Sequence, residues 1–218
     1  AHSGIIGRTP QTAEPENKLQ SFIFTPETDN FDIILNVSNF TQALGGASHP
    51  LYLGTPEKID YINHIVVGRD YFLLGIFFIT VSLCLLIYVV RRKIALLLYV
   101  AMCALLATRT AINGSYPIHL MLPHLSYYAD VRLDYLSLYW LPDVYYWILL
   151  ILYPREFSRK VGIVYLVFAI AMSVLTLMLP VSSFTKLLVL AHTAAFIMGF
   201  ACIYMLIQAL KTGGADTP

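Results

Sequence analysis

One acidic residue stands near the middle of a long apolar run in the second half of the chain. Asp143 has four aromatic neighbours at helical spacings of three and four residues: Tyr139, Trp140, Tyr146 and Trp147. A charged carboxylate facing lipid costs several kcal/mol, so an acid at this depth usually faces a cavity or another helix. Two interpretations remain open. The group is either an aromatic-lined ligand or switch site, or a protonated acid that hydrogen-bonds a tyrosine and only joins helices.

Arg109 is a second charge near the end of another apolar run. Its guanidinium could pair with Asp143 or bind an anionic ligand. Arginines near helix ends also often extend toward the lipid head groups, and we favour this snorkelling interpretation. Arg109 is retained as a second candidate ligand or switch residue.

The segment 113–134 contains four side chains of types that bind metals: His119, His124, Asp130 and Asp134. They are scattered over a long, proline-containing segment, whereas metal ligands usually follow a tighter spacing. Ordinary loop residues at a membrane interface explain them better. We therefore predict no metal site.

Catalytic motifs are missing from the sequence. It contains no G-x-S-x-G, H-E-x-x-H or Walker A pattern. An intramembrane aspartyl protease needs two facing acids, and only Asp143 is suitably placed. We expect no enzymatic activity and no cofactor.

The composition indicates a membrane protein. Hydrophobic residues make up 58% of the chain and charged residues 12%, which is outside the range of ordinary soluble domains. No basic run interleaved with aromatic residues suggests nucleic-acid binding. All three cysteines lie in apolar runs and are expected to be buried thiols.

Five apolar segments are long enough to cross a bilayer. A hydrocarbon core of ~30 Å requires about 20 residues at ~1.5 Å rise per residue. Helices are expected because a lone segment in lipid must satisfy its own backbone hydrogen bonds. The predicted spans cover residues 71–90, 94–112, 135–153, 161–179 and 187–210. In the last span Ala191, Ala195 and Gly199 recur every four residues, a spacing typical of close helix packing or dimerisation.

Basic residues predict the orientation of these spans. Clusters follow the first, third and fifth spans, at Arg91–Lys93, Arg155–Lys160 and Lys211. The positive-inside rule places these clusters and the tail 211–218 in the cytoplasm. Residues 1–69 and 113–134 are then outside.

The N-terminal region has a different pattern. Apolar and polar residues alternate over Phe31–Phe40, which predicts a half-buried strand, and Pro50–Leu53 and Ser21–Phe24 are further strand candidates. We expect residues 1–54 to be the end of a larger outer β-domain, in a chain that is processed or excerpted. Thr55-Pro56-Glu57 resembles a helix start, so residues 55–70 are predicted to form a short amphipathic helix that lies at the membrane surface and leads into the first span.

Several short motifs resemble one bacterial family, the seven-transmembrane receptors with diverse intracellular signalling modules. The outer motifs are Asn36-Val37-Ser38-Asn39-Phe40, Gly45-Gly46 and Leu53-Gly54. The membrane motifs are Arg109 with Asn113-Gly114, Arg132-Leu133-Asp134-Tyr135-Leu136, Pro142, and Tyr153-Pro154-Arg155-Glu156-Phe157-Ser158. Their order and spacing together carry the resemblance, which covers residues 31–210.

The resemblance implies an all-α transmembrane helix bundle preceded by a partial extracellular, jelly-roll-like β segment. It implies a sensory receptor in the bacterial inner membrane, with an outside small molecule or carbohydrate as signal and a cytoplasmic signalling domain as output. A homodimer is compatible with this scheme. The chain departs from the family plan because it has five predicted spans and no output domain. The alternative is a fragment of a transporter with a mid-membrane site at Asp143, although no repeated, interrupted span accompanies Pro142.

Overall fold

The computed structural model describes residues 4–16, 20–26, 28, 31–43, 45 and 51–211. Within these residues, five helices are long and apolar enough to cross a membrane, judged by length and composition. The predicted helical bundle is therefore confirmed. The long helices are α1 (Pro56–Arg91), α2 (Ile94–Ile112), α4 (Tyr127–Leu152), α5 (Arg159–Met178) and α7 (Leu188–Lys211).

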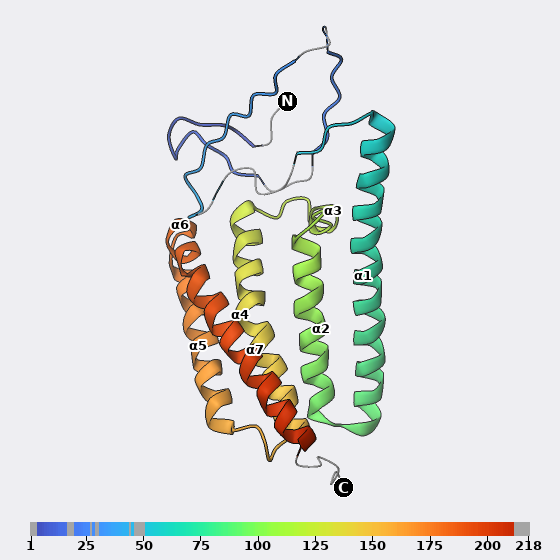
Figure 1. Ribbon diagram of the computed structural model, residues 1–218, viewed down its shortest axis with the longest axis vertical. Coiled ribbons are helices and arrows are strands. Elements are labelled where there is room, and N and C mark those ends of the chain that lie inside the picture. The colour runs from blue at the N-terminus through green and yellow to red at the C-terminus, as the bar shows by residue number, and fades with distance from the viewer. Residues whose placement is uncertain are drawn as a thin grey trace.

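Three short elements lie at the same end of the bundle as the N-terminal segment (Figure 1). Helix α3 (Ile118–Met121) lies between α2 and α4, while α6 (Val181–Phe184) and the 3-10 turn η1 (Thr185–Leu187) lead into α7. We call this end of the bundle the outer end, following the predicted orientation. Turns at this end bring residues of several helices together.

Helix α1 is a single element of 36 residues. It begins as predicted, with Pro56 in the first turn and Glu57 close to the positive end of the helix dipole. It ends where Arg92 adopts a left-handed conformation (φ 54°) and donates its backbone N–H to the Tyr88 carbonyl. The residues predicted to form a helix leading into the first span are helical from Pro56, but they are continuous with that span and do not form an element of their own.

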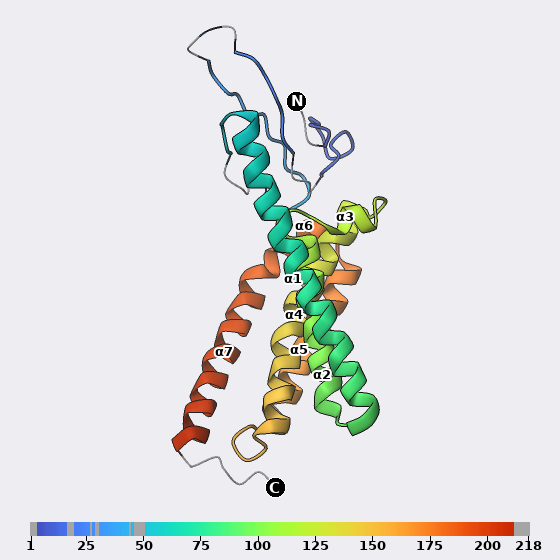
Figure 2. The ribbon, with the colours of Figure 1, turned by 90° about the vertical axis from the view of Figure 1, so that its right-hand side faces the viewer.

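Helix α4 is the centre of the bundle. It packs against α2, α5 and α7, whereas α1 packs on α2. Figure 2 shows α7 inclined away from α5 toward the end at Lys211. The apolar stretch of α4 is half buried, while that of α1 is not buried within this chain. The contrast follows from position in the bundle, since α4 is surrounded by other helices whereas α1 packs on α2 at the edge.

Two aromatic clusters form the core. In the outer cluster the ring of Tyr135 meets that of Phe184 edge-on at 5.2 Å between centroids. In the inner cluster Tyr146 meets Phe157, from the loop after α4, at 5.4 Å. Burying such aromatic pairs fixes the register between α4 and the segments on either side of it.

The predicted strands do not form within the described residues. The described residues before α1 contain one isolated bridge, between Ile5 and Glu14, and no strand. Over Phe31–Phe40 the alternation does not separate two faces, since Ile33 and its neighbour Ile34 are both exposed. A strand needs a paired neighbour and a covered face, and the described residues supply neither for this segment. Pro50 and Gly46, which belonged to the predicted second strand and turn, lie outside the described residues, as does the tail 212–218.

Candidate functional site

Asp143 is buried in α4 directly after Pro142 and is only 3% exposed. The Trp147 side chain, one turn further on, hydrogen-bonds to its carboxyl group. The Oδ1 atom has no hydrogen-bond partner among the described residues. A buried oxygen that accepts no hydrogen bond raises the free energy of the folded state. A proton, a water molecule or a helix movement that supplies a hydrogen bond at this atom would lower that free energy.

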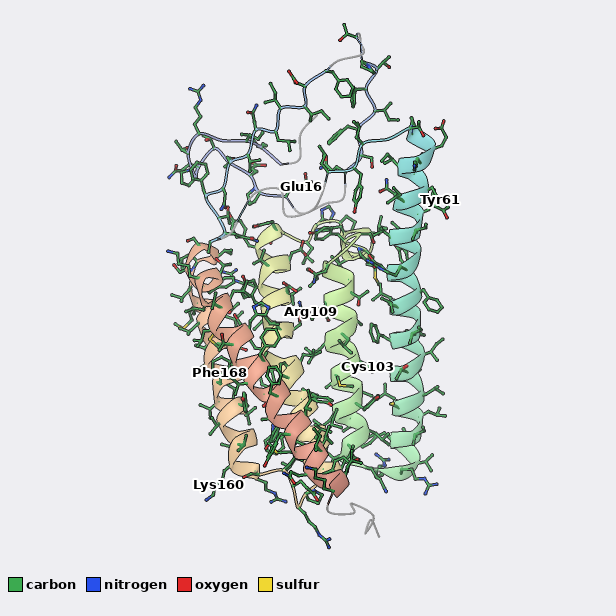
Figure 3. All side chains as sticks on the ribbon, viewed as in Figure 1. Glu16, Tyr61, Cys103, Arg109, Lys160 and Phe168 are labelled. Carbon is green, nitrogen blue, oxygen red and sulfur yellow. The ribbon has the colours of Figure 1, made fainter. Side chains whose placement is uncertain are left out.

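A small cavity of about 10 Å³ lies beside Asp143, between α4, α5 and α7. Phe168 contributes from α5, and Ala191 and Ala195 from α7 (Figure 3 labels Phe168). This volume holds about one water molecule. Pro142 also lines the cavity and has no N–H to donate to the carbonyl of Leu138, a second lining residue. The lining is mostly apolar, and Asp143 is its one acidic residue.

The four aromatic residues around Asp143 do not form one shared pocket. Of the four, Tyr139 alone lines the cavity, and its hydroxyl accepts a hydrogen bond from Thr176 at 3.3 Å. The Trp140 indole donates to Ser173 Oγ on α5 at 3.1 Å, outside the cavity. The Tyr146 hydroxyl donates to the Ser158 carbonyl at 3.0 Å and holds the loop after α4.

Arg109 pairs with Asp134, and not with Asp143, which was one of the partners considered for it. Its Nη1 lies 3.1 Å from Asp134 Oδ1 and also donates to the Asp134 carbonyl at 3.1 Å. Asn113 donates to the same carboxylate at 3.0 Å. Figure 3 shows Arg109 in the outer half of α2. Three residues of the motifs that carried the family resemblance thus meet at the α2–α4 contact.

A second outer junction was missed by the sequence analysis. Asp70 of α1 is 2% exposed and accepts hydrogen bonds from the backbone N–H and the hydroxyl of Ser115, at 2.9 and 2.7 Å. Arg69 adds an ion pair at 2.8 Å. Gly114 (φ +76°) gives the turn the conformation that brings Ser115 to this carboxylate. The sequence feature that could have indicated this junction is the adjacent pair Arg69-Asp70, which directly precedes an apolar run.

The outer histidines also differ from each other. His119 Nε2 lies 2.7 Å from Asp130 Oδ2, and Asp130 is fully buried at the start of α4. His124 is exposed, and Asp134 is engaged by Arg109. Within the part of the chain described, no three such residues lie close enough to hold a metal ion.

The small residues of α7 separate into two groups. Ala191 and Ala195 face the cavity beside Asp143. An added Cβ at Gly199 would meet no described atom within 4 Å, other than those of its own helix. Close packing of α7 on α4 therefore involves the outer half of the predicted stripe.

Comparisons with known proteins give one finding. Residues 69–217, from α1 to beyond the end of α7, match the sequence model of a family described as 7TM diverse intracellular signalling. Comparisons with curated proteins and with solved structures give no match.

Proposed function

Because this chain belongs to the 7TM diverse intracellular signalling family, we propose that it is the membrane region of a bacterial sensory receptor. In this proposal the chain lies in the inner membrane with its N-terminal segment outside. It relays the presence of a small molecule or carbohydrate to a cytoplasmic signalling domain, as a monomer or homodimer. The chain itself catalyses no reaction in this scheme.

The observation that carries the relay is a contact between the N-terminal segment and the start of α7. The Ala43 backbone N–H donates to Thr185 Oγ1 at 3.0 Å, and the Gln42 side chain hydrogen-bonds to Tyr127 on α4. Asn39 shapes this segment, since its Oδ1 accepts the N–H groups of Thr41 and Gln42. A shift of the N-terminal segment would therefore act directly on η1 and the first turn of α7.

Asp143 is the proposed switch within the membrane. It lies where α7 crosses α4, beside a cavity lined by alanines of α7. Its Oδ1 atom has no hydrogen-bond partner among the described residues. The contact between α4 and α7 is therefore sensitive to small movements, because a shift of α7 changes which groups lie next to this oxygen. Arg109 is assigned to the outer α2–α4 junction in this scheme.

Distances between spin labels at the cytoplasmic ends of α5 and α7 test the relay. The labels are placed by Arg159→Cys and Leu210→Cys, both at exposed positions, in a chain whose own cysteines are replaced by alanine. Pulsed electron resonance in nanodiscs then compares Thr185→Val with the parent. Valine keeps the shape of threonine but cannot accept the Ala43 N–H. We expect the distance distribution to shift, and Asp143→Leu to shift it as well.

Ser182→Ala is the matched control. Ser182 is an exposed hydroxyl residue in the same outer turn, and its replacement should leave the distribution unchanged. Identical distributions for the parent, Thr185→Val and Asp143→Leu would remove the basis for a relay through α7.

The transporter alternative has less support. A mid-membrane substrate site at Asp143 would need a cavity far larger than one water molecule, and the cavity is about 10 Å³. This volume and the family membership both favour the receptor proposal.

A further inference from the structure

The buried pair His119–Asp130 is the most unusual polar contact outside the proposed relay. Asp130 Oδ2 lies 2.7 Å from His119 Nε2, and the two side chains are 0% and 14% exposed. Asp130 Oδ1 and His119 Nδ1 are both buried and have no partner among the described residues. Among the described residues, the imidazole is therefore the only side chain that pairs with the carboxylate, which also lies in the first turn of α4, where the helix dipole favours negative charge.

We infer that His119 and Asp130 form a proton-binding site that fastens the outer segment Asn113–Leu125 onto α4. His119 lies in α3, which has four residues and little packing of its own, and Asp130 lies in the first turn of α4. One proton between them gives either an ion pair or a neutral hydrogen-bonded pair. Both forms are neutral overall and suit a buried position.

Loss of that proton leaves a buried negative charge. A neutral imidazole can still donate one hydrogen bond, but a single donor does not balance a desolvated carboxylate. The segment must then open so that water can solvate Asp130.

Other charges near the pair do not replace the proton. Tyr116, in the same segment, has its ring centroid 6.4 Å from that of His119. Asp134, one turn along α4, adds negative charge but is paired with Arg109 of α2. The other nearby arginines have partners elsewhere: Arg132 donates to the Thr176 carbonyl on α5, and Arg69 of α1 is paired with Asp70.

The direction of the pH dependence follows from this arrangement. The closed segment holds one proton more than the open segment does near neutral pH. Closure is therefore complete at low pH and is lost as the pH rises through the range where the pair releases its proton. Acidification outside would hold the segment on α4.

Amide hydrogen exchange of the full chain in nanodiscs tests the site between about pH 5.5 and 8.5. The reporters are hydrogen-bonded backbone N–H groups of the segment, those of Leu120, Leu122 and Leu125. After correction for the intrinsic rate at each pH, we expect their protection to fall about tenfold across this range. The amides within α2 should keep constant protection.

Three substitutions give distinct results. Asp130→Asn has a similar shape and no charge to balance, so protection should become independent of pH. His119→Gln leaves Asp130 alone to carry the proton and should displace the midpoint. His124→Gln, in the same segment but exposed, should reproduce the parent profile.

A pH-independent profile in the parent chain would overturn the inference, as would an unchanged midpoint in His119→Gln. The inference rests on the proposed receptor function only for its biological role. Amide exchange reports on the segment Asn113–Leu125, whereas the spin-label distances report on the proposed relay through α7. A negative result in one experiment is therefore distinguishable from a negative result in the other.

Discussion

Gly114 shows how strongly a single residue constrains the outer end of the bundle. Asp70 is a nearly fully buried carboxylate, and it is tolerated because Ser115 and Arg69 donate to it. The turn that presents Ser115 passes so close that a Cβ on Gly114 would lie 2.6 Å from Asp70 Oδ2. The φ of +76° also disfavours any other residue. The α1–α2 junction therefore depends on this glycine.

Gly114→Ala should destabilise the bundle by about 1–3 kcal/mol, from the left-handed backbone and the displaced carboxylate. Unfolding in mixed detergent micelles, followed by circular dichroism, measures the change. Gly68→Ala is the control, because its Cβ would meet nothing within 4 Å and α1 is helical there. That variant should be neutral or stabilised by up to about 1 kcal/mol. Equal behaviour of the two variants would contradict the role given to Gly114.

The sequence indicated which polar residues are unusual better than it indicated which residues they contact. An acid among aromatic residues is visible at Asp143 from spacing within one helix. The partner of Arg109 was not visible, because Asp134 lies on another helix and its position depends on how α2 and α4 pack. The same holds for Asp70 and for His119 with Asp130. Each of these pairs joins segments whose relative placement is a tertiary property.

The existence of five long helices could be predicted because each apolar run carries its own signal of length. The start of the third was predicted too late, since α4 begins at Tyr127, within the expected loop 113–134. The boundary between the expected surface helix and the first span was wrong, since a change from amphipathic to fully apolar residues does not interrupt backbone hydrogen bonding in α1. The strand prediction was wrong because a strand, unlike a membrane-spanning helix, depends on hydrogen bonds to another segment. An alternating pattern such as Phe31–Phe40 describes only one side of a pairing that must be supplied by another strand.

Ala191→Leu tests the contact of α7 with α4. Ala191 is 4% exposed and lines the cavity at Asp143, so a larger side chain overfills the contact. We expect a loss of about 1–3 kcal/mol. Gly199→Leu, two turns further along α7, should cost less, because its Cβ enters open space. Steric trapping in bicelles measures both. A larger loss at Gly199 would mean that α7 packs in a different register.

The whole molecule is asymmetric along its long axis. The end of α1, the start of α5 and the end of α7 lie together at one end, and the N-terminal segment lies at the other (Figures 1 and 3). The first of these ends carries Arg91, Lys160 and Lys211. This grouping agrees with the spacing of basic residues in the sequence, and the orientation in a bilayer stays a prediction.

Cysteine labelling in intact cells tests that orientation. His124→Cys and Ser158→Cys are introduced singly into the cysteine-free chain, since both positions are exposed. An impermeant thiol reagent should label position 124 in intact cells and position 158 only after permeabilisation. Gel-shift detection of each variant at equal abundance gives the comparison. Reaction of Ser158→Cys from outside would reverse the assigned topology.

The length of α1 has a mechanical consequence. Asp70, anchored to Ser115, divides the helix into an arm of about 21 Å that includes Tyr61 and an arm of about 32 Å that ends at Arg91, at ~1.5 Å per residue. A rigid rod tilting about such a fulcrum swings its ends in opposite directions. The longer arm sweeps about one and a half times as far. If α1 tilted about Asp70 as a rigid rod, a displacement of its first turn would therefore appear reversed and enlarged at Arg91.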